Sequence, residues 1–555
     1  MRRMKYRIYL VAALFLSAVS VSAQDLDPTV VVDRAYEGKL IEVHKPALEM
    51  AVPDSVLRFE LDFDYSVFDN PYKGSYEFTP YLLSMKPSAS ADGASRFYLR
   101  AGAGYNLRPE FDMIWSPIFR NRGVGVDVYA NHRSYIGKYH DLSGVNGYEP
   151  WGGNDLRSRA GVDFTYDWNK TVLTAGVGYD GIAASRPGLR HSYNGLDVSF
   201  SLASRPKPYD ERFMYAVKAS YKAAKDNICS GAAYVRENLF NFNAGVGFAT
   251  RRSMLKFDFG ADFVNCSDAY KAAAAQFYVT PHYIYRKGRF IADLGVKISK
   301  IVDSDDQDNS FGAKADQVLY PDVHMELPII RNALKLKVDV TGGNTLNTYS
   351  SLLNDNHHLS LDYAMGNGCL LDYTVERINA FVGLEGRISS KFSYLLYGSA
   401  GYVDTALLEY VTMSEDGIFK TGIIYVPMAK ASVGLDCMWK DESVMVDASL
   451  KYTFSDSVLS EYVLMPAAVV GDIAVEYNWN RRLFVGVDCS YSSARTSKLY
   501  TMDAYADLGL YAEYATTRKL SFWGRGGNLL GMKIQRTPLM AEKGMYFTLG
   551  ICLNL

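Results

Sequence analysis

The side chains best suited to chemistry gather in two polar stretches of the chain. His357 and His358 follow an Asn-Asp-Asn run at 354–356, and imidazole and carboxylate groups of this kind can ligate a transition metal. Adjacent histidines lack the spacing that places two ligands on one side of a helix. We therefore interpret this stretch as a solvated polar loop and predict no metal site there.

The second stretch, at 303–309, reads Asp-Ser-Asp-Asp-Gln-Asp-Asn. Its oxygen atoms suit Ca²⁺, but it lacks the glycine and the terminal glutamate of an EF-hand, so we expect a charged surface loop. The sequence also offers no Ser-His-Asp or Asp-His set on neighbouring strand ends. We predict no catalytic residues, no enzymatic activity and no cofactor.

The elements that carry these stretches are indicated by alternation. In 255–263, Leu, Phe, Phe, Ala and Phe occupy the odd positions, while Lys, Asp, Gly and Asp occupy the even ones. A period of two places one set on each face of a sheet, and the pattern recurs about twenty times. Apolar residues outward and polar residues toward a wet lumen are typical of a transmembrane antiparallel β-barrel, an all-β fold.

The amino terminus predicts export. Residues 1–23 combine a basic start (Arg2, Arg3), an apolar run at 8–19 and a small-residue cleavage site ending at Ala23, which together are typical of a signal peptide. The mature chain would then begin at Gln24. After it, no run of eighteen or more apolar residues indicates a spanning helix. A periplasmic, secreted or outer-membrane protein would fit, and the alternation favours the outer membrane.

Composition agrees with this reading. Aromatic residues make up 14% of the 555 residues, 42 of them tyrosine, and amphipathic rings suit the headgroup zone of a bilayer. The formal net charge is −2, and no basic face stands out, so we predict no nucleic-acid partner.

Residues 24–93 differ from the rest of the chain. They hold six of the 18 prolines, at 28, 46, 53, 71, 80 and 87, and prolines this dense disfavour central strands and long helices. We predict a mostly irregular periplasmic or lumen segment here, followed by the barrel at 94–555.

The connections between strands indicate their number and direction. Short links are predicted at 168–170, 250–253, 286–288, 330–333, 389–391, 440–442, 479–482 and 516–519, and long ones at 137–155, 302–315, 341–372, 403–420 and 531–543. Because such barrels have short periplasmic turns and longer outer loops, this order gives about 22 strands, within a range of roughly 18–24, with both barrel ends in the periplasm.

The cysteines and the last residues give further expectations. Phe547, Leu549 and Ile551 alternate up to the carboxyl end, as in a closing strand that the barrel-assembly machinery recognises. Cysteines 437, 489 and 552 are predicted to face lipid as small hydrophobes. Cys229 and Cys266 lie near neighbouring outer loops, where a disulfide is geometrically conceivable.

In its second half, the chain resembles the barrel of TonB-dependent receptors. The resemblance is carried by the penultimate hairpin at 520–531, which includes Gly527, Asn528, Leu529 and Leu530 and is similar to the turn before the last strand of that family. The family's strand number is also 22. The resemblance implies an outer-membrane location and a role in passing a solute across that membrane.

The resemblance extends to the mature amino terminus. Family members begin with a short Ton box, which pairs with TonB, and Thr29, Val30, Val31 and Val32 look similar to it. The alternative is a short apolar strand packed in the lumen.

The chain departs from the family in the length of its plug. Family members fold a plug of well over a hundred residues inside the barrel, whereas here only residues 24–93 precede the first strand. A barrel of this size is wide enough to need filling. The short segment, inward side chains and loops, or a partner protein could fill it.

Two functions follow from the sequence. The first is uptake or passage of an unidentified solute across the outer membrane, with outer-membrane lipid and TonB, or another envelope protein, as partners. The alternative is a structural or accessory barrel in an envelope complex, which the shortened plug motivates.

Overall fold

A computed structural model gives the structure of the chain. It describes residues 96–105, 108–119, 123–145, 148–168, 170–186, 188–205, 213–228, 233–250, 252–303, 318–330, 333–359, 371–542 and 544–555. All of them belong to one compact unit, residues 79–555. The predicted signal peptide and the segment at 24–93 lie outside the described residues.

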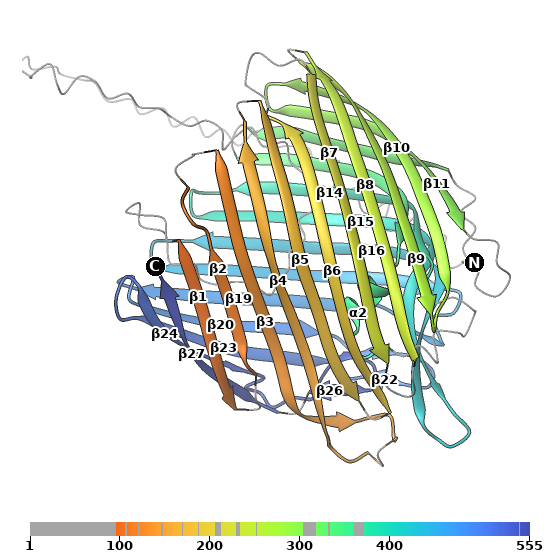
Figure 1. Cartoon of the computed structure of the whole chain (residues 1–555), viewed down its shortest axis with the longest axis vertical. Helices are drawn as coiled ribbons and strands as arrows, with labels where there is room; N and C mark the ends of the chain where they lie inside the picture. The colour runs from red at the N-terminus through yellow and green to blue at the C-terminus, as the bar shows by residue number, and fades with distance from the viewer. Residues whose placement is uncertain are drawn as a thin grey trace, which may run out of the picture. The chain divides into compact units, whose positions relative to one another are not determined.

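This unit is a closed antiparallel β-barrel with 22 wall strands, as predicted (Figure 1). The first eleven are β1 (Phe97–Tyr105), β2 (Glu110–Trp115), β3 (Val124–Asp141), β4 (Trp151–Asp167), β5 (Thr171–Arg186), β6 (Leu189–Ser204), β7 (Phe213–Ile228), β8 (Ala233–Ala249), β9 (Ser253–Asp268), β10 (Ala272–Lys287) and β11 (Phe290–Asp303). The others are β12 (Leu319–Ile330), β13 (Leu334–Leu346), β14 (Tyr373–Arg387), β15 (Phe392–Met413), β16 (Phe419–Lys440), β17 (Val444–Ser457), β19 (Val469–Trp479), β20 (Leu483–Ser492), β23 (Tyr505–Ala515), β24 (Leu520–Gly527) and β27 (Tyr546–Asn554).

Short elements fill the connections at one end of the barrel. They are the helix α2 (Tyr349–Asp355) and the strands β18 (Val463–Leu464), β21 (Arg495–Thr496), β22 (Thr501–Met502), β25 (Ile534–Thr537) and β26 (Met540–Glu542). We call this end the loop end and the opposite end, where β4–β5 and β8–β9 are joined, the turn end. No helix among the described residues is both long and apolar enough to cross a membrane.

The two faces of the wall differ as the alternation predicts. Phe257 and Phe259 point outward and are 43% and 41% exposed. Lys256 and Asp258 point into the lumen, where they form an ion pair of 2.6 Å. The apolar exterior and the charged interior are those of a barrel that crosses a bilayer.

The cysteines follow this alternation, with one correction. Cys437 and Cys489 lie in the outward phase of their strands, beside the exposed Leu435 and Val487, as predicted. The prediction for Cys552 is wrong, because this residue alternates with the outward-facing Ile551 and is only 7% exposed. It faces the lumen.

The barrel closes where β27 pairs with β1. Their register opposes Gly550 to Gly102, and the Trp523 ring lies so close to both residues that a Cβ on either would collide with it. The Arg100 guanidinium stacks 4.1 Å from the centre of the same ring. These glycines therefore let a tryptophan pack flat against the seam from the lumen side.

Two predicted long links are instead extensions of strands. Within 137–155, pairing continues to Tyr139 opposite Trp151, and within 403–420 it continues to Met413 opposite Phe419. Above the bilayer, backbone N–H and C=O groups still need hydrogen-bond partners. Outward-facing side chains no longer contact lipid there, so they need not be apolar. The hairpins therefore continue without the pattern that reveals strands inside the membrane.

Candidate functional site

The main feature of the lumen is the first part of the connection between β13 and β14, residues 347–359, which folds back into the barrel. Its helix α2 begins at Thr348, whose hydroxyl accepts a hydrogen bond from the Ser351 backbone N–H at 3.2 Å. The Ser351 hydroxyl in turn accepts one from the Thr348 N–H at 2.9 Å. This reciprocal capping box satisfies donors that a short helix would otherwise leave unpaired.

One side of α2 is apolar and packs against the inner face of the wall. Tyr349, Leu352 and Leu353 recur at the spacing of one helix face and are at most 3% exposed. They join a cluster with inward-facing residues of the wall, which include Ile182, Tyr193, Val235, Val264, Cys266 and Ala274. Figure 1 shows α2 behind the wall strands of this side. The segment is therefore anchored by a hydrophobic core inside the lumen.

A buried polar network ties the same helix to β6 and β7. The Asp226 carboxylate accepts hydrogen bonds from the Tyr349 hydroxyl at 2.5 Å, from the Ser192 N–H at 2.8 Å and from His191 Nδ1 at 2.6 Å. His191 Nε2 lies 2.6 Å from the Leu359 carbonyl oxygen. The imidazole ring thus links the Asp226 carboxylate to the backbone at Leu359.

A second carboxylate holds the first turn of α2. Glu237 Oε2 accepts a hydrogen bond of 3.1 Å from the Ser350 N–H, and its Oε1 lies 3.9 Å from the Cys266 thiol. Because Glu237 is 1% exposed, removing its partner would leave a buried carboxyl oxygen without a hydrogen bond.

From Asn354 onward, the segment contacts β3 and β4 of the wall. Arg157 donates a hydrogen bond to Asn354, and His357 Nδ1 lies 2.6 Å from Asp155 Oδ1. His358 is 7% exposed and meets the Tyr139 ring edge to face, with 6.0 Å between ring centres. Residues 354–358 therefore do not form the solvated polar loop that the sequence analysis expects.

Burial changes the acid–base behaviour of this segment. Loss of hydration lowers the pKa of His358 to about 4 and holds the pKa of Tyr349 well above its ordinary value. It also raises the pKa of Asp355. His358 Nδ1 has no hydrogen-bond partner, so a second proton on this ring would be unsatisfied.

The turn-end half of the lumen has a different lining. Ion pairs line its strands. His324 pairs with Asp322 on its own strand and with Asp339 on β13, both at 2.9 Å, and Lys337 pairs with Glu385 across β13 and β14 at 2.6 Å. Most of these side chains stay partly exposed. This half is polar and of mixed charge sign.

A cavity of about 320 Å³ lies between the two halves. Its lining includes Asp262, Gln276, Lys297, Asn344 and the capping Thr348. Gln276 and Asn344 both donate to the Ser299 hydroxyl, at 3.0 and 3.3 Å. The cavity thus presents donors, acceptors and charges of both signs directly below α2.

Several predicted features fall outside the described residues. These are the Ton-box-like Thr29, Val30, Val31 and Val32, the partner thiol Cys229, and the acidic stretch after Asp303. Cys266, the other half of the conceivable disulfide, is a buried free thiol. Among the residues that the structure describes, no group of three His, Cys, Asp or Glu side chains could hold a metal ion.

The infolded segment was missed, although the sequence carries a signal for it. On β9 the inward positions change from Asp258 and Asp262 to Val264 and Cys266 toward the loop end. Where the inward positions of a strand become apolar, the inner face of the wall is expected to pack against another part of the protein. The spacing of Tyr349, Leu352 and Leu353 identifies one matching apolar face.

Comparison with known proteins gives a likeness in structure only. No protein-family model and no curated protein matches the sequence. The copper transporter OprC superposes with a TM-score of 0.62 at 12% identity, over 83% of this chain and 80% of that one. The siderophore receptor PirA from Acinetobacter baumannii gives 0.61 at 9%, over 83% and 80%.

The FrpB iron transporter from Neisseria meningitidis gives a TM-score of 0.62 at 9% identity, over 83% of this chain and 82% of that one. At such identities the likeness establishes the fold. This chain shares the closed 22-strand barrel of those transporters and receptors, the fold that its resemblance to TonB-dependent receptors predicts.

Proposed function

We propose that the protein is an outer-membrane transporter that passes a polar solute through its lumen, with the infolded segment at 347–359 as the gate. The observation that carries this proposal is a wide barrel whose loop-end lumen is occupied by one of its own connections. The solved structures that share the fold are named as transporters and receptors for copper, iron and siderophores. The loop end faces the outside, because outer loops are the longer ones.

The cavity below α2 supports a polar solute. Asp262 and Lys297 supply opposite charges, and Gln276 and Asn344 supply amide groups. A solute that both donates and accepts hydrogen bonds would be held there before it crosses the turn-end half.

The amino-terminal residues have a role in the same proposal. Thr29, Val30, Val31 and Val32 would pair as a strand with TonB, and the segment at 24–93 would act as a short plug. Their resemblance to the Ton box and their position before the barrel support this assignment.

Conductance in planar bilayers tests the gate. Four proteins should be compared: the mature chain, a chain without residues 24–93, a chain with 348–371 replaced by a short turn, and the double deletion. We expect the double deletion to give the largest steady currents and each single deletion to give less, since a barrel of this width is open unless filled. Equal, low conductance in all four would contradict the proposal.

TonB association separates transport from the accessory role. Removing residues 27–33 should abolish co-purification with TonB and leave the barrel folded. If the intact chain does not bind TonB, or if the deletion leaves binding unchanged, energised uptake is wrong. A stable envelope partner recovered instead would favour the accessory barrel.

A further inference from the structure

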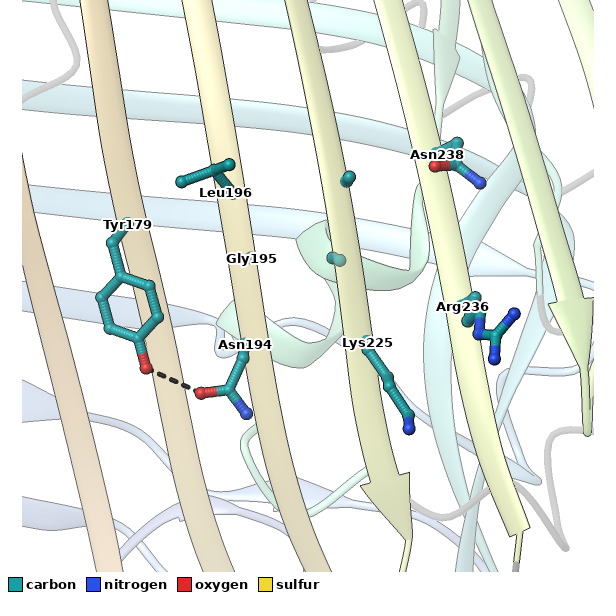
Figure 2. Close-up of a pocket in the computed structure, with 9 residues that line it drawn as sticks. Tyr179, Asn194, Gly195, Leu196, Lys225, Arg236 and Asn238 are labelled. Carbon is teal, nitrogen blue, oxygen red and sulfur yellow. Dashed lines mark hydrogen bonds between the residues drawn. The ribbon is translucent and has the colours of Figure 1, made fainter.

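The exterior of the barrel carries a groove near the loop end, on β5 to β8. Its volume is about 300 Å³, and its lining includes Asn194, Leu196, Ala223, Lys225, Arg236 and Asn238. Figure 2 shows the labelled side chains of this groove spread across neighbouring strands, with the tips of Lys225 and Arg236 close to the strand ends. Small side chains at its floor leave room for a ligand.

The groove lies at the upper boundary of the lipid-facing belt. The next outward-facing row of side chains toward the turn end is apolar and exposed. It consists of Val198, Tyr221 and Phe240. The Tyr179 hydroxyl donates to Asn194 Oδ1 at 2.7 Å, and the Tyr221 hydroxyl donates to Asn238 Oδ1 at 2.9 Å. Tyrosines whose rings are apolar and whose hydroxyls meet polar groups mark the headgroup level of a bilayer.

Two cations stand directly opposite each other in this polar row. The register of β7 and β8 pairs Lys225 with Arg236, both are exposed, and like charges directly across a strand pair repel. Asp268 offsets part of the charge, with its Oδ2 3.5 Å from Arg236 Nε. The exposed Arg190 lies on the same face of β6, nearer the loop end. An excess of positive charge remains.

The aromatic ring beside these cations holds them in place. Lys225 Nζ lies 4.6 Å and Arg236 Cζ 5.1 Å from the centre of the Tyr234 ring. Cation–π contacts of this kind keep both groups at one height of the wall. The two side chains are thus held in a position to bind one anion between them.

We propose that this groove binds a phosphorylated lipid of the outer leaflet, with its phosphate on Lys225 and Arg236 and an acyl chain over Ala223 and Leu196. A phosphate that bridges the two cations relieves their repulsion through charge-assisted hydrogen bonds. The floor is apolar and continuous with the lipid-facing belt, which favours an acyl chain over an acidic peptide. Basic pockets at a membrane surface recognise lipid headgroups in this way.

Native mass spectrometry of the purified full chain tests the proposal, with diphosphoryl lipid A as the probe and phosphatidylcholine as the lipid without net charge. We expect a retained lipid A adduct on the wild-type protein. Lys225→Gln with Arg236→Gln should weaken it about thirtyfold, since each cation near a membrane surface contributes to anionic lipid binding. Ala223→Phe should also weaken it by filling the groove without changing charge.

A matched control removes the same charge elsewhere. Lys287→Gln with Arg289→Gln alters two exposed cations at the turn end, and lipid A binding should not change. All variants should keep the heat-dependent gel mobility of a folded barrel. Wild-type lipid A affinity in the Lys225/Arg236 double variant overturns the proposal, as does an adduct of inorganic phosphate as strong as that of the lipid.

Discussion

The two halves of the lumen are lined by the same strands, but their inward side chains differ in what they contact. Toward the turn end, inward side chains form ion pairs such as Lys335 with Glu385, which water can reach. Toward the loop end, inward residues such as Ile182 and Val264 form a dry core with α2. The comparison shows that one barrel wall can be channel lining at one height and protein core at another.

The contrast is energetic as well as structural. Partly exposed ion pairs contribute little to stability because they remain solvated. A buried core and a buried carboxylate with three partners contribute far more when one member is removed. Substitutions in the loop-end half should therefore lower the stability of the infolded segment strongly, and substitutions in the turn-end half should lower it weakly.

The largest effect is expected from Tyr349→Ala. This change empties a fully buried site and removes one of the hydrogen bonds to Asp226, which should cost about 3–5 kcal/mol of the segment's local stability. Hydrogen exchange at residues 347–359 should accelerate, while exchange in the wall strands stays slow. Tyr397→Ala, in the turn-end half, is the control, and a similar acceleration at 347–359 in that variant would break the comparison.

Acid should open the gate through His358. Its pKa in the folded chain is about 4, below the ordinary value of about 6.5. Its stabilising contribution is therefore fully present above pH 6.5 and is lost as the pH falls toward 4, a difference of about 3 kcal/mol. Limited proteolysis of the segment should increase between pH 7 and pH 5.

His358→Phe provides the matched variant for this pH effect. A phenyl ring can keep the contact with Tyr139 but cannot take up a proton, so its proteolysis should depend less on pH. The same pH profile in both proteins would show that other groups control the opening.

A smaller effect is expected from Asp226→Asn. The amide keeps the shape of the carboxylate but loses the charge that faces His191, which should cost about 1.5–3 kcal/mol. Hydrogen exchange at 347–359 should rise to a level between those of the wild type and Tyr349→Ala. Exchange faster than in Tyr349→Ala would mean that the hydrogen bonds of Asp226, not the apolar core, dominate the local stability of the segment.

The smallest effect is expected from Lys335→Gln in the turn-end half. Lys335 Nζ lies 3.1 Å from Glu385 Oε2, and both side chains are more than one third exposed. The change should cost less than about 1 kcal/mol and should not alter proteolysis of the segment. A measurable opening of the gate would show that the two halves are coupled.

The sequence predicted the wall well because lipid imposes a strict rule on it. Outward Phe257 and inward Lys256 follow directly from alternation, and the order of short and long links gives the number of strands. Above the bilayer, outward residues need not be apolar and the alternation stops. The extended hairpins at 137–155 and 403–420 were therefore expected to be loops. Cys552 was predicted to face lipid because it is a small apolar residue, but it occupies the inward phase next to the outward-facing Ile551.

The infolded segment could not be derived in the same way. A period of 3.6 over Tyr349, Leu352 and Leu353 predicts a helix face, but where that face packs depends on contacts such as Asp226 with Tyr349, 123 residues apart. Similarly, His357 and His358 appear in the sequence only as adjacent polar residues. Their burial comes from the wall that surrounds them.

Thiol labelling gives the most direct test of the packing of the infolded segment in the loop-end lumen. In a chain whose six native cysteines are replaced by serine, Ser350→Cys should react with a polar maleimide about a hundredfold more slowly than Asp416→Cys. Ser350 is 4% exposed beside Glu237, whereas Asp416 stands in the open turn after β15. Equal labelling rates at the two positions in the folded barrel would contradict an infolded, packed segment.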